Sequence, residues 1–202
     1  MHSRPARGRR TVNDTPCKRM KPWRTLSRTT VLARGKYLVV EDHEIELPGG
    51  RIVRDWPWLV MPDYINVFAE TAEGKILCFE QTKYAVAGES TLAPIGGYLE
   101  SGEDPLAGAR RELLEETGYA APEWIPLGSY VADGNRGGGS AHLFLARGAV
   151  PTAAVASDDL EEQLLLRLTR AEFRQAADEG KFRVLAWAAN AALALRKLEP
   201  LP

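Results

Sequence analysis

The chain has 202 residues, with 26 basic and 27 acidic side chains and a formal net charge of −1 at pH 7. This length suits one domain with its own hydrophobic core and leaves room for a small appendage. The balanced charge argues against a broad surface for a nucleic-acid polymer, so a small ligand of nucleotide size is easier to accommodate.

Cysteine usage and hydropathy exclude further classes. The two cysteines, Cys17 and Cys78, lie in a polar stretch and in an apolar run, which supports neither a disulfide framework nor a zinc site. No run reaches the roughly 18–20 apolar residues of a membrane-spanning helix. No apolar segment of a secretory signal follows Met1 either. We therefore expect a cytoplasmic protein without membrane contact.

The first 20 residues differ in composition from the rest of the chain. Six Arg or Lys side chains stand against one acid, Asp14, and almost nothing apolar is present. This composition predicts a disordered basic tail over residues 1–20. A transit segment and a nucleic-acid arm are the sharper alternatives, and the lack of Leu or Phe at helical spacing weighs against the first.

Residues 21–60 form a second unit, rich in β-branched and alternating residues. Strands are predicted at 37–40, 45–47 and 51–56, with the turn between the last two at Pro48-Gly49-Gly50. A β region this small buries little surface by itself. We expect it to pack on the main domain, residues 61–202, or on a second copy of the chain.

The main domain shows alternating strand patterns and two helical patterns near its end. The predicted strands are 64–71, 75–81, 125–132, 142–146 and 164–168. The glycine-rich segment 133–140 is predicted to be a mobile loop whose amides and Arg136 meet phosphate, with a plain hairpin loop as the alternative. Thr169 to Glu172 is a capping box that begins a helix ended by Gly180, and 184–198 forms the last helix.

The most informative stretch runs from Gly97 to Tyr119. Asp104 and Pro105 predict a helix start and Gly118 predicts its end, which places 105–117 on a helix. Three carboxylates, Glu112, Glu115 and Glu116, then fall within an arc of roughly 100°. Like charges at this spacing destabilise a helix, and oxygen ligation of a divalent cation gives them a purpose. A surface helix with a solvated charged face is the alternative.

The spacing of these residues resembles the Nudix box, the signature of hydrolases that cleave nucleoside diphosphates linked to another moiety. Gly97, Glu103 and the run from Arg111 to Gly118 stand at the offsets of the box, with Tyr119 where an aliphatic residue is usual. The resemblance implies an α/β/α sandwich with a mixed sheet, preceded here by the small antiparallel β region. It also implies Mg²⁺, or Mn²⁺, held by the Gly97 carbonyl and by Glu112, Glu115 and Glu116.

The same resemblance suggests roles for individual residues. Glu115, Glu116, Glu162 and Arg111 are the catalytic candidates, while Glu103 and Gly118 are structural residues of the site. Arg111 can pair with Glu103 across the turn. Glu162 would face the metals as an extra ligand or as the base, with Glu161 as the alternative and a solvated acidic loop as the plain interpretation.

The β region upstream of the box resembles the ADP-ribose pyrophosphatase branch, in which it mediates a homodimer. Trp56, Lys83 and Arg136 are the substrate-binding candidates, with burial as the alternative for Trp56. Lys83 stands where that branch usually has Arg, and the segment 94–97 is one residue longer than usual. We expect hydrolysis of ADP-ribose or an ADP-sugar to AMP and a sugar phosphate. GDP-mannose, NADH, dinucleotides, coenzyme A and a non-catalytic nucleotide sensor are the alternatives.

Overall fold

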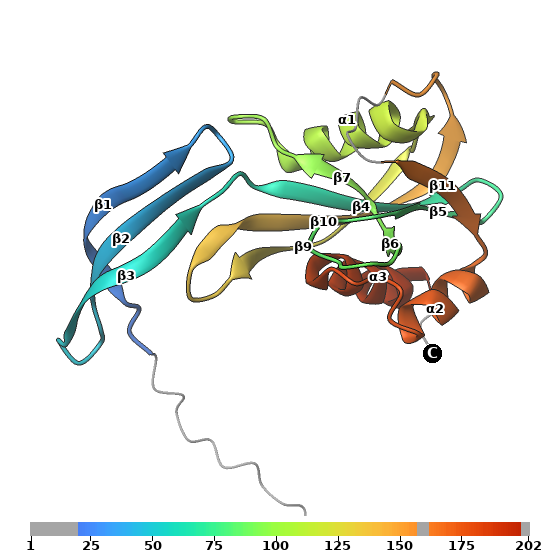
Figure 1. Cartoon of the computed structure of the whole chain (residues 1–202). Helices are drawn as coiled ribbons and strands as arrows, with labels where there is room; N and C mark the ends of the chain where they lie inside the picture. Colours follow the sequence, from blue (N-terminus) through green and yellow to red (C-terminus); the bar gives the residue numbers. More distant parts are fainter. Residues whose placement is uncertain (1–19, 157–161, 199–202) are drawn as a thin grey trace, which may run out of the picture.

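A computed structural model of the chain describes residues 20–156 and 162–198. The predicted tail therefore lies outside the described residues except for Met20, and so does Glu161. Within the described part, three long strands form an arm that stands to one side of a larger sheet covered by helices (Figure 1). We use the term arm for residues 24–60 throughout.

The arm is an antiparallel meander of β1 (Arg24–Arg34), β2 (Leu38–Glu46) and β3 (Ile52–Val60). The predicted turn is present, since the amide of Gly50 donates to the Leu47 carbonyl at 2.9 Å. The two short strands expected at 37–40 and 45–47 are instead one continuous strand. The polar residues 41–44 between them show no apolar alternation, so no pattern in the sequence indicates that the strand continues. These residues can be polar because β1 and β3, which flank β2, lie largely in solvent.

Both parallel and antiparallel pairs build the main sheet, which continues from the arm in the order β3-β10-β4-β5-β11. Strands β10 and β4 run parallel over Ala141 to Ala149, and the arm joins the sheet through one residue pair, Leu59 with Gly137. The strands are β4 (Tyr64–Thr71), β5 (Ile76–Gln81), β6 (Thr91–Ala93), β7 (Ile95–Tyr98), β8 (Tyr119–Ala120), β9 (Glu123–Asp133), β10 (Gly137–Pro151) and β11 (Gln163–Leu168). The short strands β6 and β7 were not predicted.

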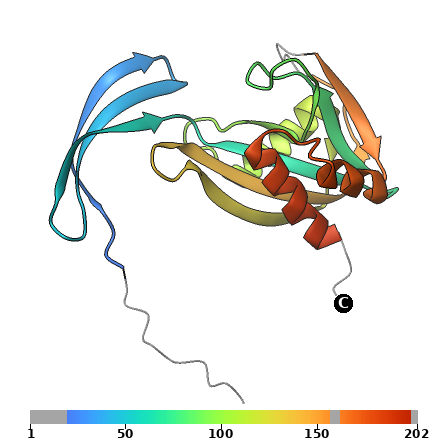
Figure 2. The same cartoon turned by 60° about the horizontal axis from the view of Figure 1, so that its bottom comes forward.

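Helices cover both faces of this sheet, so the predicted α/β/α sandwich is confirmed. Helix α1 (Pro105–Thr117) lies on one face, and α2 (Arg170–Asp178) and α3 (Leu185–Leu198) lie on the other (Figures 1 and 2). Side chains alternate across β4, so Ile65 and Val67 join the core under α1 while Phe68 joins the core under α2 and α3. None of the helices in the described ranges is long and apolar enough to cross a membrane.

The prediction of a mobile loop over 133–140 is wrong. Residues Gly137 to Ser140 begin β10 and pair with the end of β9, which leaves only a tight turn at 134–136. Asp133 closes this turn, because its Oδ1 accepts the amides of Asn135 at 2.7 Å and Arg136 at 2.9 Å. The connection is a hairpin with a much shorter turn than either expectation, and its glycine run carried no strand pattern that the sequence could reveal. A phosphate contact of Arg136 stays a prediction.

Candidate active site

Helix α1 is held at both ends by signals that are local in the sequence. The Asp104 side chain accepts the amides of Leu106 at 3.1 Å and Ala107 at 3.0 Å, and Pro105 occupies the first turn. Gly118 ends the helix in the left-handed conformation, with φ of 72°. These caps fix which side chains face the sheet edge, and they place the acidic residues beside β7.

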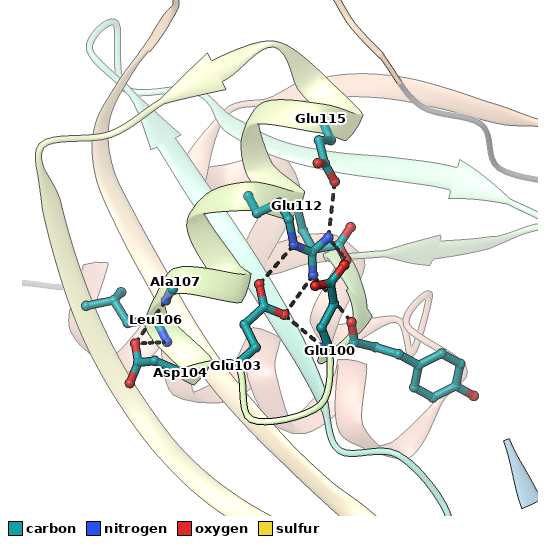
Figure 3. A network of polar contacts seen from close by, with 9 residues as sticks. Glu100, Glu103, Asp104, Leu106, Ala107, Glu112 and Glu115 are labelled. Carbon is teal, nitrogen blue, oxygen red and sulfur yellow. Dashed lines mark hydrogen bonds and ion pairs between the residues drawn. The ribbon is translucent and has the colours of Figure 1, made fainter. Parts of the chain in front are cut away.

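Arg111, in the middle of α1, is the centre of a network of charged side chains. Figure 3 shows three of its partners, Glu103, Glu112 and Glu115. The Arg111 guanidinium donates twice to Glu103, at 2.9 and 3.0 Å, and also to Glu112 at 2.8 Å and Glu115 at 3.1 Å. Glu103 in turn accepts the amide of Glu100 at 2.9 Å. The turn before the helix is thereby tied to two of the predicted metal ligands through one cation.

The charges of this network support one another. The pKa of Glu103 lies below its usual value, mainly because Arg111 donates to it and also because of the Glu100 amide. The pKa of Arg111 is raised, first by Glu103 and then by Glu112 and Glu115, against the opposing effect of burial. Both groups therefore remain ionised around neutral pH, so the turn stays locked against the helix.

The remaining contacts of the carboxylates are with the glycine strand β7. A Cβ atom at Gly97 would lie 2.1 Å from Oε1 of Glu112, far inside van der Waals contact, so only glycine allows this approach. Beside it, the amide of Gly96 donates to Oε2 of Glu116 at 3.1 Å. The backbone of β7 and two of the predicted ligands therefore meet along one edge of the helix.

This arrangement bears on the expected metal. Among the residues that the structure describes, no three His, Cys, Asp or Glu side chains are gathered into a site for a metal ion. Instead, Glu112 and Glu115 turn toward Arg111 and Glu116 turns toward Gly96. The donor set is nonetheless made only of oxygens and abuts the backbone of Gly97, which fits the preference of Mg²⁺ and Mn²⁺.

A cavity of about 260 Å³ opens on the other side of β7. Its walls include Tyr64, Asn66, Lys83, Gly96, Gly97 and Trp187. Lys83, a predicted substrate-binding residue, thus lies in the same cavity as the predicted ligand Gly97. We call this cavity the β7 pocket.

The other predicted substrate residues lie elsewhere. Trp56 belongs to the arm, where its Nε1 donates to the Asn135 carbonyl at 2.8 Å and its ring packs edge-on against Trp23. Both tryptophans line a second cavity of about 420 Å³ between the arm and the hairpin turn. Arg136 sits in that turn and, within the described part of the chain, lines neither cavity.

Glu162 is exposed and immediately precedes β11. The first residue of that strand, Gln163, pairs with Gln81, which lies two residues before Lys83. This register puts Glu162 at the same end of the sheet as Lys83. Its proposed role toward a metal stays a prediction.

Two lining residues of the β7 pocket escaped the sequence analysis, namely Asn66 and Trp187. Asn66 had a detectable signal, because it is an amide within the buried run 65–69 of β4, whose other residues are apolar. Trp187 had none, since a tryptophan on an Ala-rich helix is more often part of a core. Only the tertiary structure brings Trp187 of α3 to the same pocket as the glycines of β7.

Comparisons with known proteins agree with this geometry. The family model described as the NUDIX domain matches residues 62–188. The chain is 33% identical over 155 residues to the "Methanol dehydrogenase activator" of Bacillus methanolicus, covering 73% of this chain and 80% of that protein. It is 34% identical over 113 residues to the "ADP-ribose pyrophosphatase" of Bacillus subtilis (strain 168), covering 55% and 60% respectively. A solved structure described as an ADP compounds hydrolase shares the fold, with a TM-score of 0.72 and 18% identity over 90% of this chain and 96% of that one.

Proposed function

The chain belongs to the NUDIX domain family, as a pyrophosphohydrolase, and from this premise we propose that it cleaves ADP-ribose or a close ADP-sugar to AMP and a sugar phosphate. The observation that carries the proposal is the contact between Glu112 and the Gly97 backbone, on the opposite side of β7 from a pocket that contains Lys83. The Bacillus subtilis relative, named for ADP-ribose, supports this choice of substrate.

In the proposed reaction a water oxygen bonds to one phosphorus of the pyrophosphate. The bond from that phosphorus to the bridging oxygen breaks, and the bridging oxygen leaves with the electron pair on the other phosphate. A carboxylate accepts the proton of the water, and Glu115, Glu116 and Glu162 are the candidates for this base. Lys83 places positive charge beside the phosphates.

The acidic residues are assigned to cation binding. Mg²⁺ or Mn²⁺ would be held by the carbonyl of Gly97 and by the carboxylates of Glu112, Glu115 and Glu116. The cation would neutralise phosphate charge and lower the pKa of water. The ion pair between Arg111 and Glu103 would hold the turn before α1 in place when Glu112 and Glu115 bind a cation instead of Arg111. Arg111 donates to both Glu112 and Glu115 and so orients their carboxylates.

A substrate panel tests the proposal. ADP-ribose, NADH, GDP-mannose, diadenosine polyphosphates and coenzyme A are compared side by side with Mg²⁺, and kcat/KM is measured from the released products. We expect kcat/KM for ADP-ribose to exceed that for each rival by about tenfold or more. A tenfold ratio corresponds to ~1.4 kcal/mol of transition-state discrimination. Repeating the reaction in oxygen-labelled water identifies which phosphorus is attacked.

The outcomes separate the parts of the proposal. A rival substrate that is cleaved tenfold better than ADP-ribose would show the substrate choice to be wrong while leaving hydrolysis intact. If no compound is cleaved, the nucleotide-sensor alternative takes its place. The name of the Bacillus methanolicus relative then makes a dehydrogenase the first binding partner to test.

The arm is proposed to form a homodimer contact. All eleven residues of β1 are exposed, and this strand is the edge of the sheet order. Its apolar side chains include Leu26, Val31 and Leu32, of which Val31 is 59% exposed. An exposed edge strand with apolar side chains is a template for association, and a second copy would cover it and bring arm tryptophans toward the neighbouring active site.

Light scattering tests the dimer. The intact chain should have about twice the monomer mass of 22.3 kDa at micromolar concentration. Replacing Val31 and Leu32 together by Glu should give a monomer, because two charges would be buried in the contact. As the matched control, Val150→Glu places a charge on an exposed apolar residue of the main sheet and should leave the mass doubled. An intact chain that is monomeric and active would remove the dimer from the proposal.

A further inference from the structure

Asn66 carries a polar atom that the protein itself leaves without a partner. The residue is only 3% exposed, and its Nδ2 is buried without a hydrogen-bond partner among the residues that the structure describes. A buried donor in this state is unfavourable for the folded protein. A ligand with an acceptor oxygen at this point would satisfy the donor.

The position of Asn66 places its side chain at the wall of the β7 pocket. Its neighbours Ile65 and Val67 face α1, so alternation along β4 turns Asn66 to the face that α3 covers. The amide oxygen end lies against β7, because a Cβ atom at Gly96 would be 2.7 Å from Oδ1 of Asn66. Asn66 and Trp187 line the same pocket.

We propose that the β7 pocket is the subsite for the terminal sugar of the substrate and that Asn66 Nδ2 donates a hydrogen bond to a sugar oxygen. The proposal rests on the proposed cleavage of an ADP-sugar. The pocket shares Gly97 with the acidic site, so a ring inside it lies next to the bond to be cut. Lys83 in the same pocket lies where the phosphate that carries the sugar would enter.

Size and lining favour a sugar over the purine. The β7 pocket, of about 260 Å³, is the smaller of the two cavities and suits the smaller group, while the cavity of about 420 Å³ beside the arm tryptophans leaves more room for a purine. Trp187 and Met61 offer an apolar wall for the C–H face of a sugar, while Asn66 supplies a donor at its edge. The indole rings of Trp23 and Trp56 in the arm, which pack edge-on against each other, offer aromatic faces on which a purine can stack.

Two substrates and two variants test the subsite. Asn66→Leu removes the donor and keeps a similar side-chain size. Asn190→Leu is the matched control, because Asn190 is also fully buried with unpartnered side-chain atoms in the described structure but does not line the pocket. Both proteins are assayed with ADP-ribose and with the β-methyl ester of ADP, which has the same adenosine and pyrophosphate but no terminal sugar.

In Asn66→Leu, the ratio of kcat/KM for ADP-ribose to that for the methyl ester should fall about tenfold or more, because a polar subsite loses its contact with the sugar. In Asn190→Leu the ratio should stay at the wild-type value. The Tm of both variants should be unchanged or higher, since each removes an unpartnered buried amide. An unchanged ratio in Asn66→Leu, or an equal loss on both substrates, would overturn the proposal. Asn66→Ala gives the same comparison should the Leu variant not fold.

Calorimetry keeps the subsite distinct from the proposed function. If the wild-type protein does not cleave ADP-ribose, titration of ribose 5-phosphate and of AMP into the wild-type protein and into Asn66→Leu still tests the pocket. Weakening of ribose 5-phosphate binding by about tenfold in Asn66→Leu, with AMP binding retained, supports the sugar subsite. Weakening of AMP binding alone would assign the pocket to the base, and equal affinities in both proteins would remove Asn66 from recognition.

Discussion

Replacing Glu115 and Glu116 together by Gln should lower kcat/KM by two orders of magnitude or more, equivalent to a loss of ~3 kcal/mol of transition-state stabilisation. Gln keeps the shape of each side chain and removes the charge that a divalent cation or a proton acceptor requires. A glutamine at position 116 can still accept the hydrogen bond from the Gly96 amide through its side-chain oxygen, so the contact with β7 is preserved. Steady-state kinetics with saturating Mg²⁺ measures the loss.

The matched control changes the charge by the same amount away from the site. Glu73 and Glu123 are exposed, and their ion pairs are long, 3.6 Å to Arg167 and 4.0 Å to Arg147. Their double replacement by Gln should leave kcat/KM within about twofold, because exposed pairs of this kind contribute little. Full activity in a folded Glu115→Gln, Glu116→Gln protein would show that the helix carboxylates are not the site.

Local signals explain why helix α1 was predictable from the sequence. Asp104, Pro105 and Gly118 act on the backbone within a few residues of themselves, so their effect does not depend on the rest of the fold. The contact between Arg111 and Glu103 spans one turn and was also foreseen. A complete charge pattern on a helix of known limits was therefore enough to define the candidate carboxylates, whose role toward a metal stays a prediction.

Contacts between distant segments were not accessible in this way. The β7 pocket joins Asn66 of β4 to Trp187 of α3, and no spacing in the sequence relates these two residues. The sharing of Arg111 by Glu112 and Glu115 was also missed, because helical periodicity gives the face of a side chain but not the partner it selects. The strand at 137–140 was hidden because glycine lacks the side-chain alternation that marks a strand.

Replacing Gly97 by Ala is expected to lower kcat/KM on the order of a hundredfold, the scale of a misplacement of about 1 Å at a reacting centre. The new Cβ atom would lie 2.1 Å from Oε1 of Glu112, so the carboxylate must move away from β7. The atom that moves is the end of a flexible side chain, and the backbone at Gly97 has no positive φ that alanine would strain. The thermal midpoint should therefore stay within a few degrees of wild type, as calorimetry can measure.

The matched control is Gly49→Ala, where the added Cβ has no atom within 4 Å and the backbone is likewise free of strain. A double-mutant cycle then identifies how Gly97→Ala acts. If the methyl group acts by displacing the Glu112 carboxylate, adding Gly97→Ala to Glu112→Gln should cost much less than it costs in the wild-type protein, because the group it displaces has already lost its charge. Losses that multiply in full would contradict this mechanism and would assign the effect of Gly97 to its own backbone carbonyl.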